Sequence, residues 1–331
     1  MSLTASLFNS GLFKGGLFNG GLFANASSPP TAWYLTVVTT GASQDYTVNI
    51  SSGTGVDIYI DWGDTNSNAY TTTGQKTHTY ASAGTYTVKI SGAFSANGNI
   101  RLGSYAGNRS RLKNISPIPQ LPGLTDLSYA LNSCTGLTDH IPTDLLKYVT
   151  ECTTLYACMF GCTGLTGSIP TDLLKYVTKC TNLGYFLNGC SGLTGPIPTD
   201  FLRYVTECIN LSSCIRECSG LTGPIPTDLL KYVTKCTNLN SFIKICSGLD
   251  TTVPTDLLRH VINCTNFGDF ASGITWTTAS YSALIISMDT YLTQTGVPFH
   301  GGSSKYDTSA AAAHTNLASV KTWTIIDGGL A

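Results

Sequence analysis

One ten-residue phrase occurs five times in this chain at a fixed interval. It reads IPTDLLKYVT at 141–150, and its close copies begin at residues 169, 197, 225 and 253. The prolines of successive copies stand at positions 142, 170, 198, 226 and 254, so the period is a constant 28. A period of this length is typical of repeat proteins in which each unit packs only against its neighbours. The repeat constrains the architecture before any other feature does.

Each copy of the repeat predicts a short helix, followed by a segment that stacks on the equivalent segment of the next coil. Thr143 follows Pro142 as a helix cap, and Leu145 and Val149 recur at helical spacing. One apolar ladder runs through Leu127, Leu155, Leu183, Leu211, Leu239 and Phe267. A second ladder runs through Ala130, Cys158, Phe186, Cys214, Phe242 and Phe270. Helices on one side and strand-like spacing on the other predict a curved stack.

Twelve cysteines follow the same period. Five follow the repeat prolines by ten residues, at 152, 180, 208, 236 and 264, and five precede a proline by eight, at 134, 162, 190, 218 and 246. Cys158 and Cys214 occupy a position where other copies have Phe or Ala. Such exchange indicates a small hydrophobe, so we expect reduced, buried thiols. Disulfides rank second, and zinc third because no paired CxxC occurs.

Charged and aromatic residues also repeat. A basic line comprises Lys147, Lys175, Arg203, Lys231 and Arg259, with Tyr148, Tyr176, Tyr204, Tyr232 and His260 beside it. This stripe is either a surface for a glycan or an acidic partner, or a solvated face whose tyrosines cover the core. The residues Glu151, Lys179, Glu207 and Lys235 alternate in sign, which predicts attraction between neighbouring coils.

The repeat resembles the leucine-rich repeats of the BspA-like surface-protein group. The pattern C-T-N-L-x-x-F-x-x-C-S-G-L occurs at Cys180 to Leu193 and again at Cys236 to Leu249, and the resemblance covers about residues 112–275. It implies a binding or structural surface and no enzymatic activity.

Residues 31–103 differ from the repeats in composition. Short runs rich in Val, Tyr, Thr and Ile alternate with turns, which predicts a small β-sandwich. The segments IYIDWGDT (58–65) and HTYASAGTYTVKI (78–90) resemble the PKD domain, an Ig-like module, with Thr65 where that family has Gly. Asp61, Asp64 and His78 are read as stabilising this turn, and a metal or acid-base cluster is the alternative.

Both ends of the chain carry distinct patterns. Residues 6–25 contain four Leu-Phe pairs at a period of five, too few apolar groups for a core of their own. We expect them to dock on a partner by strand addition, with self-association or a pentapeptide-type coil as alternatives. The docking residues are Leu7, Phe8, Leu12, Phe13, Leu17, Phe18, Leu22 and Phe23. Residues 281–296 and 307–323 predict two short helices, and the stretch 299–329 resembles C-terminal segments of bacteriophage virion proteins.

Composition and motifs exclude several function classes. The formal net charge is -1 and charged residues make up 11% of the chain, so we expect no nucleic-acid partner. The chain has neither the pattern of a signal peptide nor a run of about 18 apolar residues, so we expect no leader and no membrane insertion. No catalytic motif occurs, and we expect no enzyme activity, cofactor or metal.

These patterns together predict a multidomain chain. Residues 1–30 form an extended docking peptide and linker, 31–103 an all-β Ig-like (PKD) sandwich, 104–275 an α/β leucine-rich-repeat solenoid, and 276–331 a small helical cap.

The expected function is that of a structural and recognition protein on a bacteriophage particle, present in several copies. Residues 1–28 would bind other virion proteins, and the repeats would face a host-surface glycan or protein. The alternative is a BspA-like bacterial adhesin. The candidate ligand residues, which the repeat does not dictate, are Tyr156, Tyr185, Arg216, Glu217 and Lys244.

Overall fold

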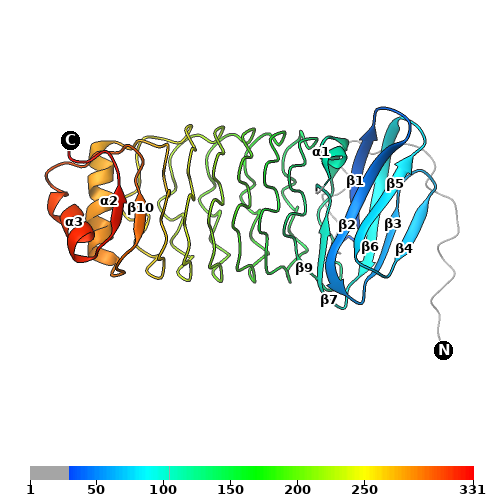
Figure 1. Ribbon diagram of the computed structural model, residues 1–331, viewed down its shortest axis with the longest axis horizontal. Coiled ribbons are helices and arrows are strands. Elements are labelled where there is room, and N and C mark those ends of the chain that lie inside the picture. The colour runs from blue at the N-terminus through cyan, green and yellow to red at the C-terminus, as the bar shows by residue number, and fades with distance from the viewer. Residues whose placement is uncertain (1–29, 104) are drawn as a thin grey trace.

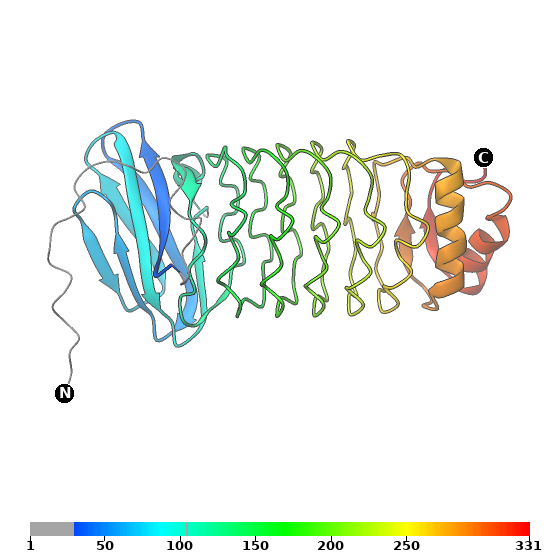
Figure 2. The ribbon, with the colours of Figure 1, turned by 180° about the vertical axis from the view of Figure 1, so that it is seen from behind.

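The protein is an elongated body with a two-sheet sandwich at one end and a helical region at the other (Figure 1). The computed structural model describes residues 30–103 and 105–331. Between the two ends, successive coils of the chain stack along the long axis (Figure 2). One cluster of buried apolar side chains extends from Trp33 in the sandwich to Trp323 near the C-terminus. The parts therefore share a continuous core.

Two sheets form the sandwich, with strand orders β4-β3-β6-β1-β8 and β5-β2-β7-β9. The first sheet comprises β4 (Ser67–Tyr70), β3 (Asp57–Asp61), β6 (Gly84–Ala93), β1 (Ala32–Thr39) and β8 (Leu112–Ile115). The second comprises β5 (Gly74–Tyr80), β2 (Gln44–Thr54), β7 (Ala96–Arg101) and β9 (Leu124–Asp126). A short helix, α1 (Ala106–Arg111), leads into β8. The strands β8 and β9 thus join the sheets from beyond residue 103.

The strands form because apolar and polar residues alternate along them. In β3, Ile58 and Ile60 are fully buried while Tyr59 between them is exposed. Trp33 and Trp62 fill the space between the sheets and are also fully buried. Large aromatic side chains of this kind bury the most apolar surface per residue and therefore dominate a small core.

The second sheet does not end at β9 but continues into the stacked coils. Strand β9 pairs in parallel with β7, and Asp126 of β9 bridges in parallel to Thr154 of the next coil. The same bridge then recurs once in every repeat, through Asn182, Asn210, Asn238 and Asn266. From the last coil, Phe267 bridges to Phe299 of β10 (Pro298–His300). One hydrogen-bonded ladder therefore connects the sandwich with the C-terminal region.

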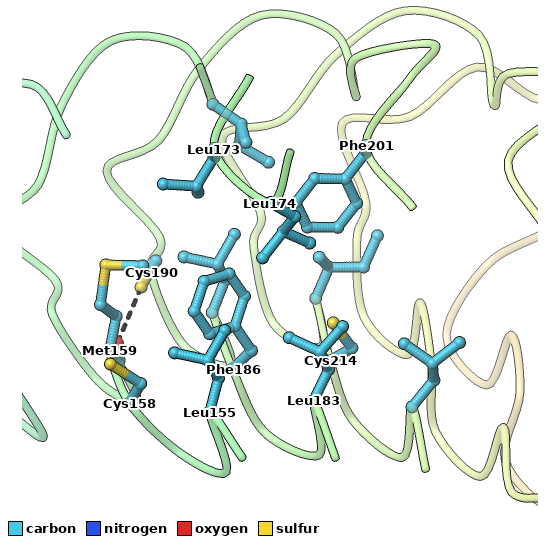
Figure 3. Packing of buried hydrophobic residues seen from close by; sticks show 14 of the residues in the cluster. Leu155, Cys158, Met159, Leu173, Leu174, Leu183, Phe186, Cys190, Phe201 and Cys214 are labelled. Carbon is cyan, nitrogen blue, oxygen red and sulfur yellow. Dashed lines mark hydrogen bonds between the residues drawn. The ribbon is translucent and has the colours of Figure 1, made fainter. Parts of the chain in front are cut away.

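Both apolar ladders predicted from the repeat are confirmed. Every member of the two ladders is fully buried, and Figure 3 shows Leu155 and Leu183 in line along the stack. Phe186 lies between Cys158 and Cys214 of the adjacent coils. A large ring in one coil is thus flanked by small thiols in its neighbours, which keeps the core filled without voids.

The predicted α/β leucine-rich-repeat solenoid is wrong. The protein is mostly β, with about 26% of residues in strands and 10% in helices, and residues 112–275 contain no helix. After Pro142 the chain forms successive tight turns, in which the N–H of Leu145 donates to Pro142 and that of Lys147 to Asp144. Each bond spans three residues instead of the four of an α-helix. Thr143 and Asp144 therefore cap no helix.

The spacing between coils explains why the repeat forms turns. Backbone bridges hold neighbouring coils at strand spacing, about 4.8 Å, whereas packed helices need about 8–10 Å. Helices would therefore separate the coils more widely on their own side and curve the stack. The observed stack runs nearly straight instead (Figures 1 and 2), so the curved surface expected from the sequence is also absent.

Charges at the coil edges pair as the sequence predicted. Lys179 lies 2.5 Å from Glu151 and Lys235 lies 2.6 Å from Glu207, and each pair joins two adjacent coils. All four side chains are exposed, so each pair contributes at most about 1 kcal/mol. The pairs support the register of the coils, while burial of the apolar ladders supplies most of the stability.

Beyond the coils lie the helices α2 (Thr278–Tyr291) and α3 (Ala311–Thr315), a π-helical turn η1 (Asn316–Val320), and β11 (Thr324–Ile326) paired in parallel with β10. These elements include the two helices predicted near residues 281–296 and 307–323. Phe267 of the last coil contacts Phe299 and stacks on Trp323 at 5.8 Å. This region therefore covers the apolar end of the last coil.

Each coil has more than one position with a left-handed backbone, and the residue types at one of these positions predict a stability difference. Gly161, Gly189 and Gly273 have positive φ there, as does Ile245 at 59°. A β-branched residue in this region costs about 1–2 kcal/mol, against about 0.5–1 kcal/mol of chain entropy for glycine. Ile245→Gly should therefore raise the free energy of unfolding by about 0.5–1 kcal/mol in urea denaturation.

The mirror substitution provides the control. Gly189→Ile should lower the free energy of unfolding by about 1 kcal/mol or more, because it introduces the same strain. An unchanged or lower stability of Ile245→Gly would contradict the explanation.

Candidate functional site

One face of the stack gathers all five candidate ligand residues. We call it the ladder face and define it as residues 126–133, 154–161, 182–189, 210–217, 238–245 and 266–273. Tyr156, Tyr185, Arg216, Glu217 and Lys244 lie in four adjacent coils of this face, and all five are partly exposed. Since the period brings equivalent positions into line, residues far apart in the sequence become neighbours here.

Alternating backbone conformations build the ladder face. The N–H of Leu155 donates to the carbonyl of Asn182 at 2.9 Å, and that of Ala157 donates to Gly184 at 2.8 Å. The N–H of Cys158, the next residue, donates instead to the carbonyl of Leu155 in its own coil. This geometry requires positive φ at one position of every coil, namely at Tyr129, Ala157, Tyr185, Ser213, Ser241 and Asp269.

An asparagine line forms one border of the ladder face. The Oδ1 atom of Asn182 accepts the N–H of Gly184 at 3.0 Å and the side-chain amide of Asn210, also at 3.0 Å. The next three asparagines accept the N–H two residues later in the same way. These amides satisfy backbone groups at the bend and hold the face rigid.

A column of tyrosines occupies the half of the ladder face nearest the sandwich. We define the tyrosine column as Tyr129, Tyr156 and Tyr185, whose ring centroids are 5.4 and 5.5 Å apart in edge-to-face contact. Phe160 flanks Tyr185 at 6.2 Å, and the guanidinium of Arg101 lies 4.9 Å from the Tyr129 ring. All five side chains are partly exposed.

The sequence reasoning missed Tyr129, Phe160 and Arg101. Tyr129 lies in register with Tyr185, and it is Tyr156 that stands one position earlier in its coil. Arg101 belongs to β7 and joins the column only because β7 pairs with β9. A strict alignment of the repeats with Tyr185 would have found Tyr129, but no sequence signal identifies Arg101.

The distal half of the ladder face carries paired charges. Arg216 lies 2.6 Å from Glu217, and Lys244 lies 2.8 Å from Asp269 of the next coil. Asp269 was not among the predicted residues. Because each cation faces a carboxylate, this half is polar but carries no concentrated charge.

Four of the five cations in the basic and aromatic stripe, on the turns after each proline, pair with carboxylates. Lys175 pairs with Asp172, Arg203 with Asp200, Lys231 with Asp228 and Arg259 with Asp256, at 3.0 to 3.5 Å. The cations of this stripe also lie over tyrosine rings, as Lys175 does over Tyr176 at 5.7 Å. The solvated reading of this stripe is therefore better supported than a site for an acidic partner.

In the sandwich, the acidic cluster stabilises a turn. Asp61 accepts the N–H of Gly63 at 3.0 Å, and Asp64 accepts that of Asn66 at 3.2 Å. The other oxygen of Asp64 lies 2.7 Å from Nε2 of His78, whose ring stacks on Trp62. The contacts agree with the turn-stabilising reading.

Asp64 links this turn to pH. Burial opposes its ionisation, but hydrogen bonds from His78 and Asn66 outweigh burial and lower the pKa below its usual value. Because the folded pKa lies below the unfolded value of about 3.9, the stabilisation is present above that pH and is lost as the pH falls through the folded pKa.

Asp64→Asn should therefore lose less stability than the wild type when acidified below about pH 4. Parallel melting-temperature curves from pH 6 to 2 would contradict this.

All twelve cysteines are free and buried. In four coils the thiol donates to a carbonyl of the preceding coil, as Cys190 does to Met159 at 3.1 Å (Figure 3). Burial raises the pKa of the Cys180 thiol to about 11 and that of Cys162 to about 12. These two thiols therefore stay protonated at neutral pH.

A thiol titration tests this arrangement. In native buffer, 5,5′-dithiobis(2-nitrobenzoate) should release almost no chromophore, and in guanidinium chloride it should detect all twelve thiols. Rapid reaction of the native protein would refute burial, and fewer thiols in denaturant would indicate disulfides.

Other kinds of site find no support in the described residues. Between residues 30 and 331, apart from residue 104, His, Cys, Asp and Glu form no group of three that could hold a metal ion. In the same part of the chain, no helix is both long and apolar enough to cross a bilayer. The predicted docking residues from Leu7 to Phe23 lie outside the described residues.

Comparisons with models of protein families, with curated proteins and with solved structures found no match.

Proposed function

We propose that this chain is a structural and recognition protein on the surface of a bacteriophage particle. Its sandwich and coils form a spacer that presents the ladder face to a partner on the host surface, and residues 1–28 attach it to other virion proteins. Two kinds of observation support this proposal. The sequence resembles surface and virion proteins, and the contacts within the molecule suit display better than catalysis.

The observation that carries the proposal is the single ladder that runs from β5 through the coils to β11. Because the ladder and the core are continuous, the body is one stiff rod with no weakly packed junction. Strand β1, the first described element of the chain, lies in the sandwich, at the opposite end from the C-terminal region (Figure 1). Attachment through the N-terminal segment would leave the coils and the C-terminal region exposed.

Residue variation on the ladder face also supports recognition. At the position of Tyr156, the next coils have Gly184, Ser212 and Asn240, although their backbone hydrogen bonds are equivalent. The apolar ladders beneath vary far less. A scaffold that tolerates any residue at a surface position leaves that position available for binding a partner.

Attachment is tested by deleting residues 1–28. The truncated protein should remain soluble and folded but should no longer join the particle, because it lacks all four Leu-Phe pairs. A matched variant with the eight Leu and Phe residues replaced by Ser should behave the same way. Normal incorporation of both variants would refute the attachment role.

Location is tested by immunogold electron microscopy with an antibody to the coils. Labelled phage particles, but unlabelled uninfected cells, are the expected result. Labelled envelopes of uninfected cells would instead support the alternative of a bacterial surface adhesin.

A further inference from the structure

We infer that the tyrosine column, together with Arg101 and Phe160, binds an uncharged polysaccharide chain lying along the axis of the stack. This inference deepens the proposed recognition function, on which it rests, by naming the class of ligand for the ladder face. Three properties of the column support it: the choice of residue, ring geometry and charge.

The fold does not require tyrosine at these positions. Tyr129 and Tyr185 occupy the same position as Ala157, Ser213 and Ser241, which have the same left-handed conformation. The tyrosine rings are only partly buried and lie outside the apolar ladders. Their presence in three consecutive coils is therefore not explained by the demands of the core.

Two of these tyrosines also carry a cost. Tyr129 has a φ of 61° and Tyr185 a φ of 59°. A bulky residue in this region is strained by about 1–2 kcal/mol, which glycine would avoid. The geometry of every coil imposes this conformation, so the cost itself belongs to the fold. A large ring at a partly exposed position that also accepts Ala or Ser does not.

Ring geometry favours a sugar chain over a proline-rich peptide. The interplanar angles are 72° between Tyr129 and Tyr156 and 62° between Tyr156 and Tyr185, so the edge of each ring meets the face of the next. Edge-to-face contact leaves no slot between parallel rings for a proline ring. It leaves a continuous strip of aromatic carbon and hydroxyl groups, suited to the C–H faces and hydroxyls of linked sugar rings.

The charges around the column favour an uncharged ligand. Arg101 is its one adjoining cation among the described contacts, and its Nε atom donates to Oδ1 of Asn99 at 3.0 Å while its guanidinium covers Tyr129. The carboxylate of Asp126 lies on the neighbouring strand β9. An anionic chain would therefore meet one occupied cation with a carboxylate nearby. The remaining Arg101 donors are suited to sugar hydroxyls.

The direction of the ligand follows from the repeat. The three rings come from three consecutive coils, so the column runs along the stack axis. A linear polymer with a short chemical repeat presents equivalent groups to successive rings, whereas a single sugar would contact only part of the column. Affinity should therefore rise with the length of the oligosaccharide.

Binding is tested on the full chain by isothermal titration calorimetry. The uncharged probes are cellohexaose, maltohexaose and chitohexaose, and the anionic probe is hexagalacturonate. At least one uncharged hexasaccharide should bind more tightly than its trisaccharide. In the variant Tyr156→Ser/Tyr185→Ser its affinity should fall at least tenfold. Serine occurs at both positions in the coil that contains Ser212 and Ser213, so the variant should fold.

The matched control is Tyr176→Ser/Tyr204→Ser on the stripe of the turns after each proline, which should bind like the wild type.

Three results would overturn the inference: no binding of any uncharged hexasaccharide at millimolar concentration, equal binding by the column variant, or preferred binding of hexagalacturonate or a decaproline peptide. Such results would leave the proposed location on the particle standing. Absence of the protein from particles would sink that proposal without affecting the sugar affinity.

Discussion

The parallel backbone hydrogen bonds between coils are the constraint on which the rest of the molecule depends. They begin where β7 pairs with β9 and recur at every asparagine position as far as the last coil. Because each bond holds two coils at strand spacing, every other feature of a coil must fit into a layer about 4.8 Å thick. Sandwich, coils and C-terminal region become one body for the same reason.

This thin layer accounts for the residues of the repeat. An α-helix is too wide for it, so the segment after each proline folds into tight turns. The thiols are small, and in four coils they donate to a carbonyl of the preceding coil, which suits a crowded core. Phe186 has small neighbours in its ladder, Cys158 and Cys214, which leave room for its ring. Where two rings are adjacent, as Phe242 and Phe270 are, they stack at 6.0 Å.

The same constraint separates the positions that hold the fold from those that are free to bind. Inward side chains are restricted to a few apolar types, whereas the outward positions of the ladder face range from glycine to tyrosine. Within that range the tyrosine column stands out, since Tyr129 and Tyr185 place large rings in a conformation that Ala157, Ser213 and Ser241 also adopt. Large, partly exposed rings at a position that also accepts small residues distinguish this surface from mere loop variation.

The sequence was sufficient for several properties, most of which depend on the period. The length of the repeat, the buried Leu and Cys ladders, the ion pair between Glu151 and Lys179, and the strands around Trp62 all follow from residue type and spacing. The helix after each proline was predicted wrongly, because IPTDLLKYVT has a helical pattern and only the thickness of the neighbouring coils forbids the helix. The tyrosine column was found only in part, since Arg101 reaches Tyr129 through the pairing of β7 with β9. The secondary-structure preference of a segment depends on its own residues. The space available to that segment is set by neighbours that lie a full repeat away in the chain.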